Sequence, residues 1–541
     1  MSSRAAIVIA AALACAAVAA VAVHELRVGA ADPAIRNTLH RGNGAEAESL
    51  DPQAARSEAA LTIARDLFEG LTSIDAAGRA VLAAADRYSV SVDGLRYEFH
   101  LRPGLRWSNG DPVLAEDFAF AWRRLVDPAT AAPYAQMLSP VRNAAQITAG
   151  KQPVSTLGVR TLGAATLEVL LERPAPYFLN LLAHPGTFPL HRASLAAFGS
   201  RFAKPGLLVS NGAYVISRWD FGSKILAARN HFYWNDANTH IERVEYHSSA
   251  QAGAELNAYR ANQLDCTATI PPSGLPYIRA NLPGQLHLSP QLAVYYYGLN
   301  LRIPPFAGAA KLRLALSMVI DRERLVHAVT GLGETPAYSF VPPQTDGYTA
   351  QVPEFAHWPM PVRIARARQL LREAALPPSL SVELRYNTGE LHAAIAVAVA
   401  SMWKENLGIG TRLHAEEFKV LLQDIDRGDM TQAFRASWVA DYNDAFNFLQ
   451  LLRTGFGINL PRYSNPAYDE LLDQANARTD AAGRRAGLEQ AERLMLADQP
   501  LIPLYFYVNK HLVKPRVRGW RDNVMNIVYS KDLSLDLTAA E

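Results

Sequence analysis

Residues 435–448, around which we expect the rest of the chain to be organised, read Arg435-Ala-Ser-Trp-Val-Ala-Asp-Tyr-Asn-Asp-Ala-Phe-Asn-Phe448. Apolar residues surround one carboxylate, Asp441, and the nearest basic residue in the sequence is Arg435. An ionised carboxylate in apolar surroundings is costly unless a positive group meets it. We hypothesise that this group comes from outside the protein, as the α-ammonium of a bound peptide, and that the rest of the chain closes around the contact.

The size and composition of the chain predict a globular protein of several lobes. Its 541 residues are too many for one hydrophobic core and indicate two or three lobes. Apolar residues make up 49% of the chain and charged residues 19%, as in ordinary globular proteins. The net charge is only +2, with lysine and arginine dispersed along the chain, so no nucleic-acid partner is predicted.

The N-terminus carries an apolar run typical of an exported protein. Arg4 precedes an alanine-rich stretch over residues 5–23, with a small-residue cleavage site near Ala20-Val21-Ala22. The run is nearly long enough to span a bilayer, so residues 1–23 are predicted to be either a cleaved signal peptide or a retained anchor. Cleavage would leave Cys266 as the only cysteine, without a partner for a disulfide, and we expect it to be a small buried side chain.

Strand and helix signals alternate along the chain, which predicts an α/β protein with one smaller α+β lobe. In the small lobe, turns at Asp93-Gly94 and Asn109-Gly110 separate short strands. A helix is predicted over residues 115–125, since acidic residues open it and arginines close it. We predict a first lobe from residues 25–71, 192–292 and 509–541, a small extra lobe over 72–191, and a hinged second lobe over 293–508.

Catalytic motifs are absent from the sequence. It contains no Gly-x-Ser-x-Gly elbow, no phosphate loop, no His-Glu-x-x-His and no Cys-x-x-Cys, and its 14 histidines are scattered. We therefore predict a binding protein and not an enzyme, without a cofactor and without a metal site.

A series of short motifs gives the chain a family resemblance. The motifs are Ser49-Leu-Asp-Pro52, Asp66-Leu-Phe-Glu-Gly-Leu71, Phe99-His-Leu-Arg102, Trp107-Ser-Asn-Gly-Asp-Pro-Val113, Glu116-Asp-Phe118, Ser210-Asn-Gly-Ala-Tyr214, Tyr295-Tyr-Tyr297, Trp438-Val-Ala-Asp-Tyr-Asn443 and Ile502-Pro-Leu-Tyr505. With these motifs the chain resembles the large extracytoplasmic solute-binding proteins of ABC importers, in the oligopeptide- and dipeptide-binding branch, over nearly everything after residue 37. The resemblance implies a bilobal periplasmic-binding-protein fold of the large peptide-binding type, which has an extra small domain and encloses a peptide between its lobes.

The same resemblance assigns roles to individual residues. Asp441 stands where the family places the acid that pairs with the peptide's α-ammonium, although it could instead cap the following turn. Arg435 and His392 match two of the basic positions that receive the peptide's C-terminal carboxylate, and a surface histidine is the alternative for His392. Backbone partners are Ser437, Trp438 and Val439 on one side and Arg56, Ser57 and Glu58 on the other, while Tyr134 and Asn257 match pocket residues.

For Trp438 and Tyr134 the residues alone allow a second interpretation. Trp438 could pack in a core instead of forming a pocket wall, and Tyr134 could be an ordinary half-buried tyrosine of its lobe. The choice between these roles requires the arrangement of the folded chain.

This sequence departs from the family pattern at several binding positions. Two expected basic residues are missing near residues 328–330 and 424–427, and Arg56 and Gly298 replace pocket acids. The paired cysteines of the similar proteins are Ala293 and Val439 here. Arg56 in place of an acid suggests a preference for peptides with acidic side chains, such as cell-wall fragments.

The residues and the resemblance together predict a monomeric periplasmic receptor. It would bind short peptides with a free N-terminus and deliver them to the membrane permease of an ABC transporter. The alternatives are a binder of a non-peptide solute or of murein peptides on the same fold, and a peptide sensor or chaperone that serves no permease.

Overall fold

The computed structural model describes residues 37–375, 380–428 and 431–538. The predicted signal or anchor over residues 1–23 lies outside this part of the chain. Within it, none of the helices combines the length and the hydropathy that crossing a membrane requires.

The first lobe is built on a four-stranded sheet in the order β1-β10-β9-β8. Its edge strand β1 runs parallel to β10, and the other neighbours are antiparallel. In β10 the side chains of Val244 and Tyr246 are buried, and the alternate residues face solvent. The elements are β1 (Thr38–Gly42), α3 (Glu58–Leu67), α7 (Arg192–Phe198), β8 (Tyr214–Asp220), β9 (Lys224–Arg229), β10 (Arg243–His247), α8 (Ala252–Arg260) and α9 (Leu275–Asn281).

The small lobe holds a four-stranded antiparallel sheet, β4-β5-β7-β6. Helix α4 covers it with the fully buried Phe118 and Trp122, which confirms the helix predicted over residues 115–125. The elements are the hairpin β2 (Thr72–Ile74) and β3 (Ala80–Leu82), β4 (Ala85–Val90), β5 (Arg96–Leu101), α4 (Ala115–Val126), α5 (Ala144–Thr148), β6 (Val159–Thr161), β7 (Thr166–Leu170) and α6 (Phe178–Leu181).

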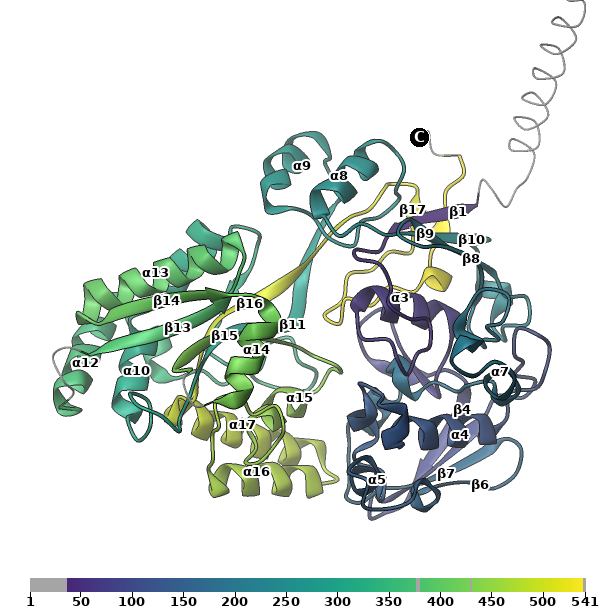
Figure 1. Cartoon of the computed structure of the whole chain (residues 1–541), viewed down its shortest axis with the longest axis horizontal. Helices are drawn as coiled ribbons and strands as arrows, with labels where there is room; N and C mark the ends of the chain where they lie inside the picture. The colour runs from purple at the N-terminus through teal and green to yellow at the C-terminus, as the bar shows by residue number, and fades with distance from the viewer. Residues whose placement is uncertain (1–36, 376–379, 429–430, 539–541) are drawn as a thin grey trace, which may run out of the picture.

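The second lobe is a six-stranded mixed sheet in the order β12-β16-β11-β15-β13-β14. Tyr295 and Tyr297 of β11 belong to a core with residues of α10, α12 and α13, whereas Tyr296 packs in the other core, on the opposite face of the strand. Figure 1 shows α10, α12 and α13 beside this sheet. The elements are β11 (Leu286–Leu299), α10 (Ala310–Met318), α11 (Arg322–Leu325), β12 (Thr335–Pro336), α12 (Met360–Glu373), β13 (Ser381–Asn387), α13 (Glu390–Leu407), β14 (Gly410–Glu416), α14 (Phe418–Arg427), β15 (Ala433–Val439), α15 (Phe446–Leu449), α16 (Pro466–Ala477), α17 (Ala481–Asp498) and β16 (Leu501–Leu512).

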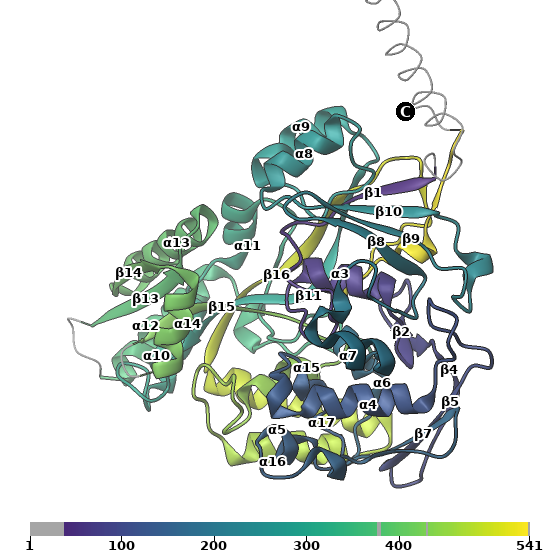
Figure 2. The ribbon, with the colours of Figure 1, turned by 45° about the vertical axis from the view of Figure 1, so that its right-hand side comes forward.

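Two long antiparallel strands, β11 and β16, run from one lobe to the other (Figures 1 and 2). The lobe boundaries predicted at 292/293 and 508/509 fall inside these strands. The pairing shifts register between Pro290 and Val294, where the Leu292 N–H donates to Val524 at 2.8 Å instead of to β16. The division into lobes stays a prediction, but such an irregularity in a shared strand is a place where the lobes can bend.

The small lobe also contacts the second lobe directly, away from β11 and β16. Tyr177 of the small lobe stacks on Tyr442 and Phe446, with ring centroids 5.4 and 5.1 Å apart. Residues 513–538 return to the first lobe, where β17 (Val517–Arg518) and β18 (Ser534–Leu535) form a short pair.

Candidate ligand-binding site

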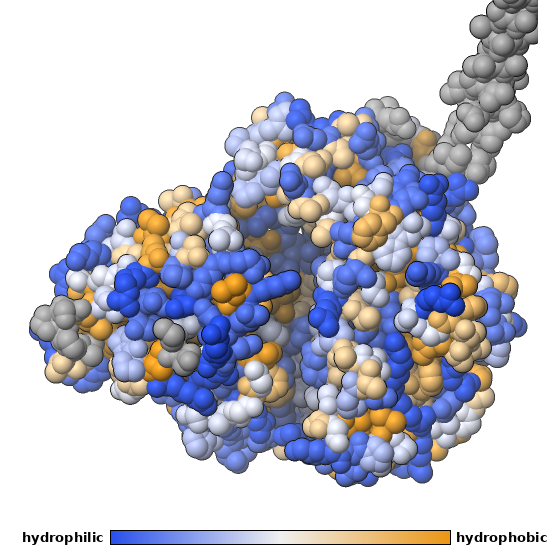
Figure 3. All heavy atoms as spheres, viewed as in Figure 1, coloured by the Kyte–Doolittle hydropathy of each residue, from blue (hydrophilic) through white to orange (hydrophobic). Residues whose placement is uncertain are grey.

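A cavity of about 310 Å³ lies between the lobes, where the space-filling view shows a cleft (Figure 3). Five residues predicted for the site line it, although they come from three distant parts of the chain. Those five are Arg56, Glu58, Tyr134, Val439 and Asp441, and the other lining residues are Leu61, Arg65, His184, Gln291, Ala440, Met525, Asn526 and Ile527.

Asp441 faces this cavity as an acid without a cation. It is half-buried, and within the described residues it forms no ion pair. Burial raises the pKa of its carboxyl group to about 6, although hydrogen bonding from Asn447 opposes the rise. Among the residues that the structure describes, no cation pairs with the negative charge that Asp441 carries at neutral pH.

Asp444, and not Asp441, caps the turn that follows this stretch. Asp444 accepts the Phe446 N–H at 2.8 Å and forms an ion pair with Arg484 at 2.8 Å. The Asp441 segment is held differently, because the Asn447 side-chain oxygen accepts the Trp438 indole N–H at 2.7 Å and the Asp441 N–H at 3.4 Å. Trp438 is therefore fixed by a polar contact and packs at the margin of the core.

The backbone beside Asp441 offers an open strand edge. From Arg435 to Val439, β15 pairs with β11 on one side. On its other side, the pairing with β13 covers only Ala433 and Phe434. The stretch over residues 435–439 therefore presents unpaired N–H and C=O groups to which another extended chain can add.

Across the cavity, the segment Arg56-Ser57-Glu58 is organised by Glu48. The N–H groups of Arg56 and Ser57 donate to the Glu48 carboxylate, in the case of Ser57 at 2.9 Å, and Ser57 caps α3 through the Ala60 N–H at 3.2 Å. Pairing of a peptide with these two N–H groups would require Glu48 to move. The Arg56 side chain is exposed and forms no ion pair with any residue that the structure describes.

Tyr134 and His184 form one wall of the cavity, with ring centroids 4.2 Å apart. Burial and the nearby carboxylate of Asp441 raise the pKa of Tyr134 to about 12, so its hydroxyl stays protonated. Burial, with the charge of Arg65, lowers the pKa of His184 to about 3, and its Nδ1 accepts the Gly186 N–H at 3.1 Å. The wall is therefore neutral.

Arg435 and His392 come together elsewhere, on the ring of Tyr295. The Arg435 guanidinium lies 4.9 Å from the ring centroid, and the His392 ring stacks on the same tyrosine at 5.8 Å. Arg435 also donates to the Tyr507 hydroxyl at 3.2 Å, but its buried Nε has no partner among the described residues. Burial and the charge of Arg435 lower the pKa of His392 to about 4, which leaves Arg435 as the permanent cation at this end of β15.

Asn257 is not brought together with the other predicted residues. It is exposed on α8, in a helical pair that packs around its own small core, and it does not line the cavity. Its role as a pocket residue stays a prediction.

The departures at Gly298 and at the cysteine positions have visible structural reasons. A Cβ atom at Gly298 would lie 2.3 Å from the ring of Phe434, so that ring fills the space of a side chain. Ala293 and Val439, the positions at which the family resemblance implies paired cysteines, are direct partners across β11 and β15. Cys266 is buried and free as predicted, and burial raises its pKa to about 12.

Several residues that line the cavity were not predicted from the sequence. Arg65 lies on α3, which buries Asp66 together with several apolar residues, and its ion pair with Glu58 at 2.7 Å holds it at the cavity. A charge on an apolar helix face was the available signal for Arg65. His184 and the stretch Met525–Ile527 carried none: the packing of the small lobe against α3 brings His184 to the cavity, and the return of the chain to the first lobe brings Met525–Ile527 there.

Two lobes joined by continuous strands, with an uncompensated acid and an open strand edge facing the cleft between them, define a two-lobed ligand-binding protein. The chain belongs to the bacterial extracellular solute-binding proteins, family 5, whose middle region matches residues 79–459.

The relatives are similar over almost their whole length. The periplasmic oligopeptide-binding protein OppA of Escherichia coli is 38% identical over 490 residues, which cover 90% of each chain. The probable deoxycholate-binding periplasmic protein YgiS of Escherichia coli is 40% identical over 496 residues, or 91% of this chain and 92% of the relative. Among solved structures, Haemophilus influenzae OppA in complex with RPPGFSPFR superposes with a TM-score of 0.78 at 35% identity, covering 92% of this chain and 99% of that one.

Proposed function

We propose that this protein is a periplasmic receptor that captures short peptides by their α-ammonium group and delivers them to the permease of an ABC importer. The proposal rests on one observation: Asp441 is a half-buried acid that faces the cavity and pairs with no cation in the described part of the chain. A primary ammonium group that entered the cavity would supply the missing charge, and a blocked N-terminus would not.

The two ends of the open strand edge support the orientation of the ligand. Asp441 lies just beyond the C-terminal end of β15, and Arg435 lies near its start. A peptide with its ammonium group at Asp441 and its carboxylate at Arg435 would therefore run antiparallel to β15. Main-chain pairing of this kind accepts many sequences, because every peptide offers the same N–H and C=O groups.

The spacing along β15 supports a short ligand. At about 3.3 Å per residue, Arg435 and Val439 are roughly 13 Å apart. With the reach of the two charged side chains added, this suits an extended peptide of about three to five residues.

Arg56 favours a second candidate ligand within the same function, a peptide with an acidic side chain such as a murein fragment. Its side chain lines the cavity and has no acidic partner in the described part of the chain. Two relatives carry names that fit these alternatives, the oligopeptide-binding OppA and the murein peptide-binding MppA of Escherichia coli, at 38% and 37% identity.

Native mass spectrometry of the purified protein tests the proposal, followed by calorimetry with a tripeptide and its N-acetylated form. We expect short peptides to co-purify and acetylation to abolish binding. Equal affinity for the free and acetylated forms would refute the peptide N-terminus as the recognised group. Gel filtration tests the expected monomer, and uptake of a labelled peptide by cells with and without the protein tests delivery.

A further inference from the structure

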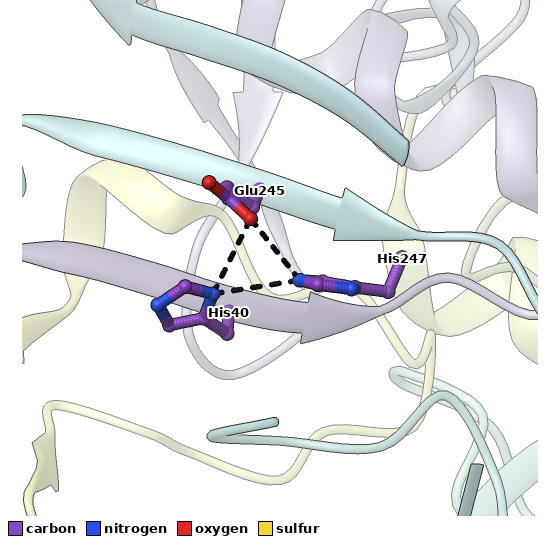
Figure 4. A group of neighbouring side chains, drawn as sticks. All are labelled: His40, Glu245 and His247. Atoms are coloured by element: carbon purple, nitrogen blue, oxygen red, sulfur yellow. Dashed lines mark hydrogen bonds and ion pairs between the residues drawn. The ribbon is translucent and has the colours of Figure 1, made fainter. Parts of the chain in front are cut away.

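Two histidines and a glutamate meet on the outer face of the first lobe (Figure 4). His40 lies on the edge strand β1, and Glu245 and His247 lie on its parallel neighbour β10. The register places His40 opposite Glu245, and because the intervening Tyr246 is buried, the three side chains share the solvent face. None of them lines the cavity described above.

Three donor atoms of this group form a nearly equilateral triangle. His40 Nδ1 lies 3.5 Å from Glu245 Oε2, and His247 Nε2 lies 3.4 Å from the same oxygen. The two histidine nitrogens are 3.4 Å apart. All three side chains are half-buried, so their geometry is held by the sheet and one side stays open to solvent.

This triangle matches the spacing of metal ligands. A tetrahedral Zn²⁺ site with bonds of about 2.0–2.1 Å separates neighbouring ligand atoms by roughly 3.3–3.4 Å. A cation could therefore bind all three atoms with little movement of the sheet. Two imidazole nitrogens and one carboxylate oxygen are a ligand set that Zn²⁺ accepts, with the fourth position left for water or an outside donor.

We propose that His40, Glu245 and His247 form a Zn²⁺ site that fastens the edge strand β1 to β10. No metal site was predicted from the sequence. His40 and His247 are 207 residues apart, and only the register of the sheet brings them together.

Lys224 would compete with a bound cation for the Glu245 carboxylate, which gives the proposal a specific test. Its ammonium group lies 2.9 Å from Glu245 Oε2, the oxygen assigned to the metal. A bound cation would repel this ammonium group, which lies on a half-buried side chain able to turn toward solvent. Removal of the lysine charge should therefore strengthen metal binding, an effect that a diffuse surface site elsewhere would not show.

Zinc titration of the full mature chain, produced without a histidine tag and stripped with a chelator, tests the site. We expect one equivalent of Zn²⁺ by calorimetry and a rise in the melting temperature on loading. His40→Ala, His247→Ala and Glu245→Gln should each weaken binding at least tenfold, whereas Lys224→Met should strengthen it. His100→Ala is the matched control, since His100 faces Glu98 at 3.1 Å on another exposed strand without a second histidine.

Cobalt supplies a second readout that does not depend on stability. Co²⁺ bound at this site should give the visible absorption of a four-coordinate ion, and the two histidine variants should lose it. Wild-type protein that binds no zinc, or His40→Ala and His247→Ala variants that bind it as tightly as the control, would overturn the proposal. Circular dichroism and unchanged peptide affinity establish that each variant is folded.

Discussion

Replacement of Asp441 by asparagine distinguishes ligand recognition from folding, because it should weaken peptide binding and raise the free energy of unfolding. The substitution keeps the size of the side chain and removes the charge. At about 3.5 Å and an effective dielectric constant of about 20, an ammonium–carboxylate contact is worth roughly 4–5 kcal/mol before desolvation is subtracted. We expect a net loss of about 2–4 kcal/mol, or an increase of about 30- to 900-fold in the Kd of a peptide.

The effect on stability has the opposite sign. Burial raises the folded-state pKa of Asp441 from 3.8 to about 6, so the folded protein binds more protons than the unfolded chain between these values. Stability is therefore lost as the pH rises through this window, and the charged carboxylate remains a cost above it. Asp441→Asn should raise the free energy of unfolding by about 1–2 kcal/mol at pH 7.5, with no difference near pH 3, after allowance for partial exposure.

Calorimetry with a tripeptide and its N-acetylated form measures the first effect, and urea unfolding at two pH values measures the second. In the asparagine variant, acetylation should cost no further affinity, because the group that senses the ammonium is gone. Asp426→Asn is a matched control, as Asp426 is exposed and forms no ion pair among the described residues. Unchanged peptide affinity in Asp441→Asn would refute the assignment.

Three further experiments probe the same structure. Peptide affinity should fall about tenfold per pH unit below pH 6, where Asp441 becomes protonated, and calorimetry between pH 5 and 7.5 should show no such fall in Asp441→Asn. Arg56→Glu should shift the ratio of the Kd values for an acidic and a basic tripeptide about tenfold or more toward the basic one; an unchanged ratio in competition binding would exclude contact with the side chain. Glu492 is fully buried and accepts three backbone N–H groups and the Tyr348 hydroxyl, so Glu492→Leu should lower the free energy of unfolding by about 3–5 kcal/mol in urea, whereas Gln490→Leu at an exposed position of the same helix should change it by less than about 1 kcal/mol.

Local signals in the sequence predicted local structure well. The helix over residues 115–125 was predicted from its charged ends, and the strand after residue 501 was predicted from its apolar run, which continues to Leu512. The lobe boundaries were harder to predict, because β11 and β16 are uninterrupted strands that cross both predicted boundaries.

Residues of the site could be predicted only where they belong to a recognisable sequence motif. Asp441 was conspicuous as an acid in an apolar run, and Tyr134 came from the family resemblance. His184 lines the same cavity, yet its position depends on the packing of the small lobe against α3 and not on any pattern in its own neighbourhood. The triangle of His40, Glu245 and His247 was not predicted either, because only the register of β1 against β10 brings these residues into contact.

The charges at the two ends of β15 imply one direction for the ligand. Asp441 is negative and lacks a cation, while Arg435 is positive and lacks a carboxylate among the described residues. A zwitterionic peptide laid along the open edge in the antiparallel direction would satisfy both, and the reversed direction would place like charges together at both ends. We therefore expect a peptide blocked at both termini to lose more affinity than one blocked at either end alone. The loss in the double variant of Asp441 and Arg435 should equal the sum of the single losses if the two ends act independently.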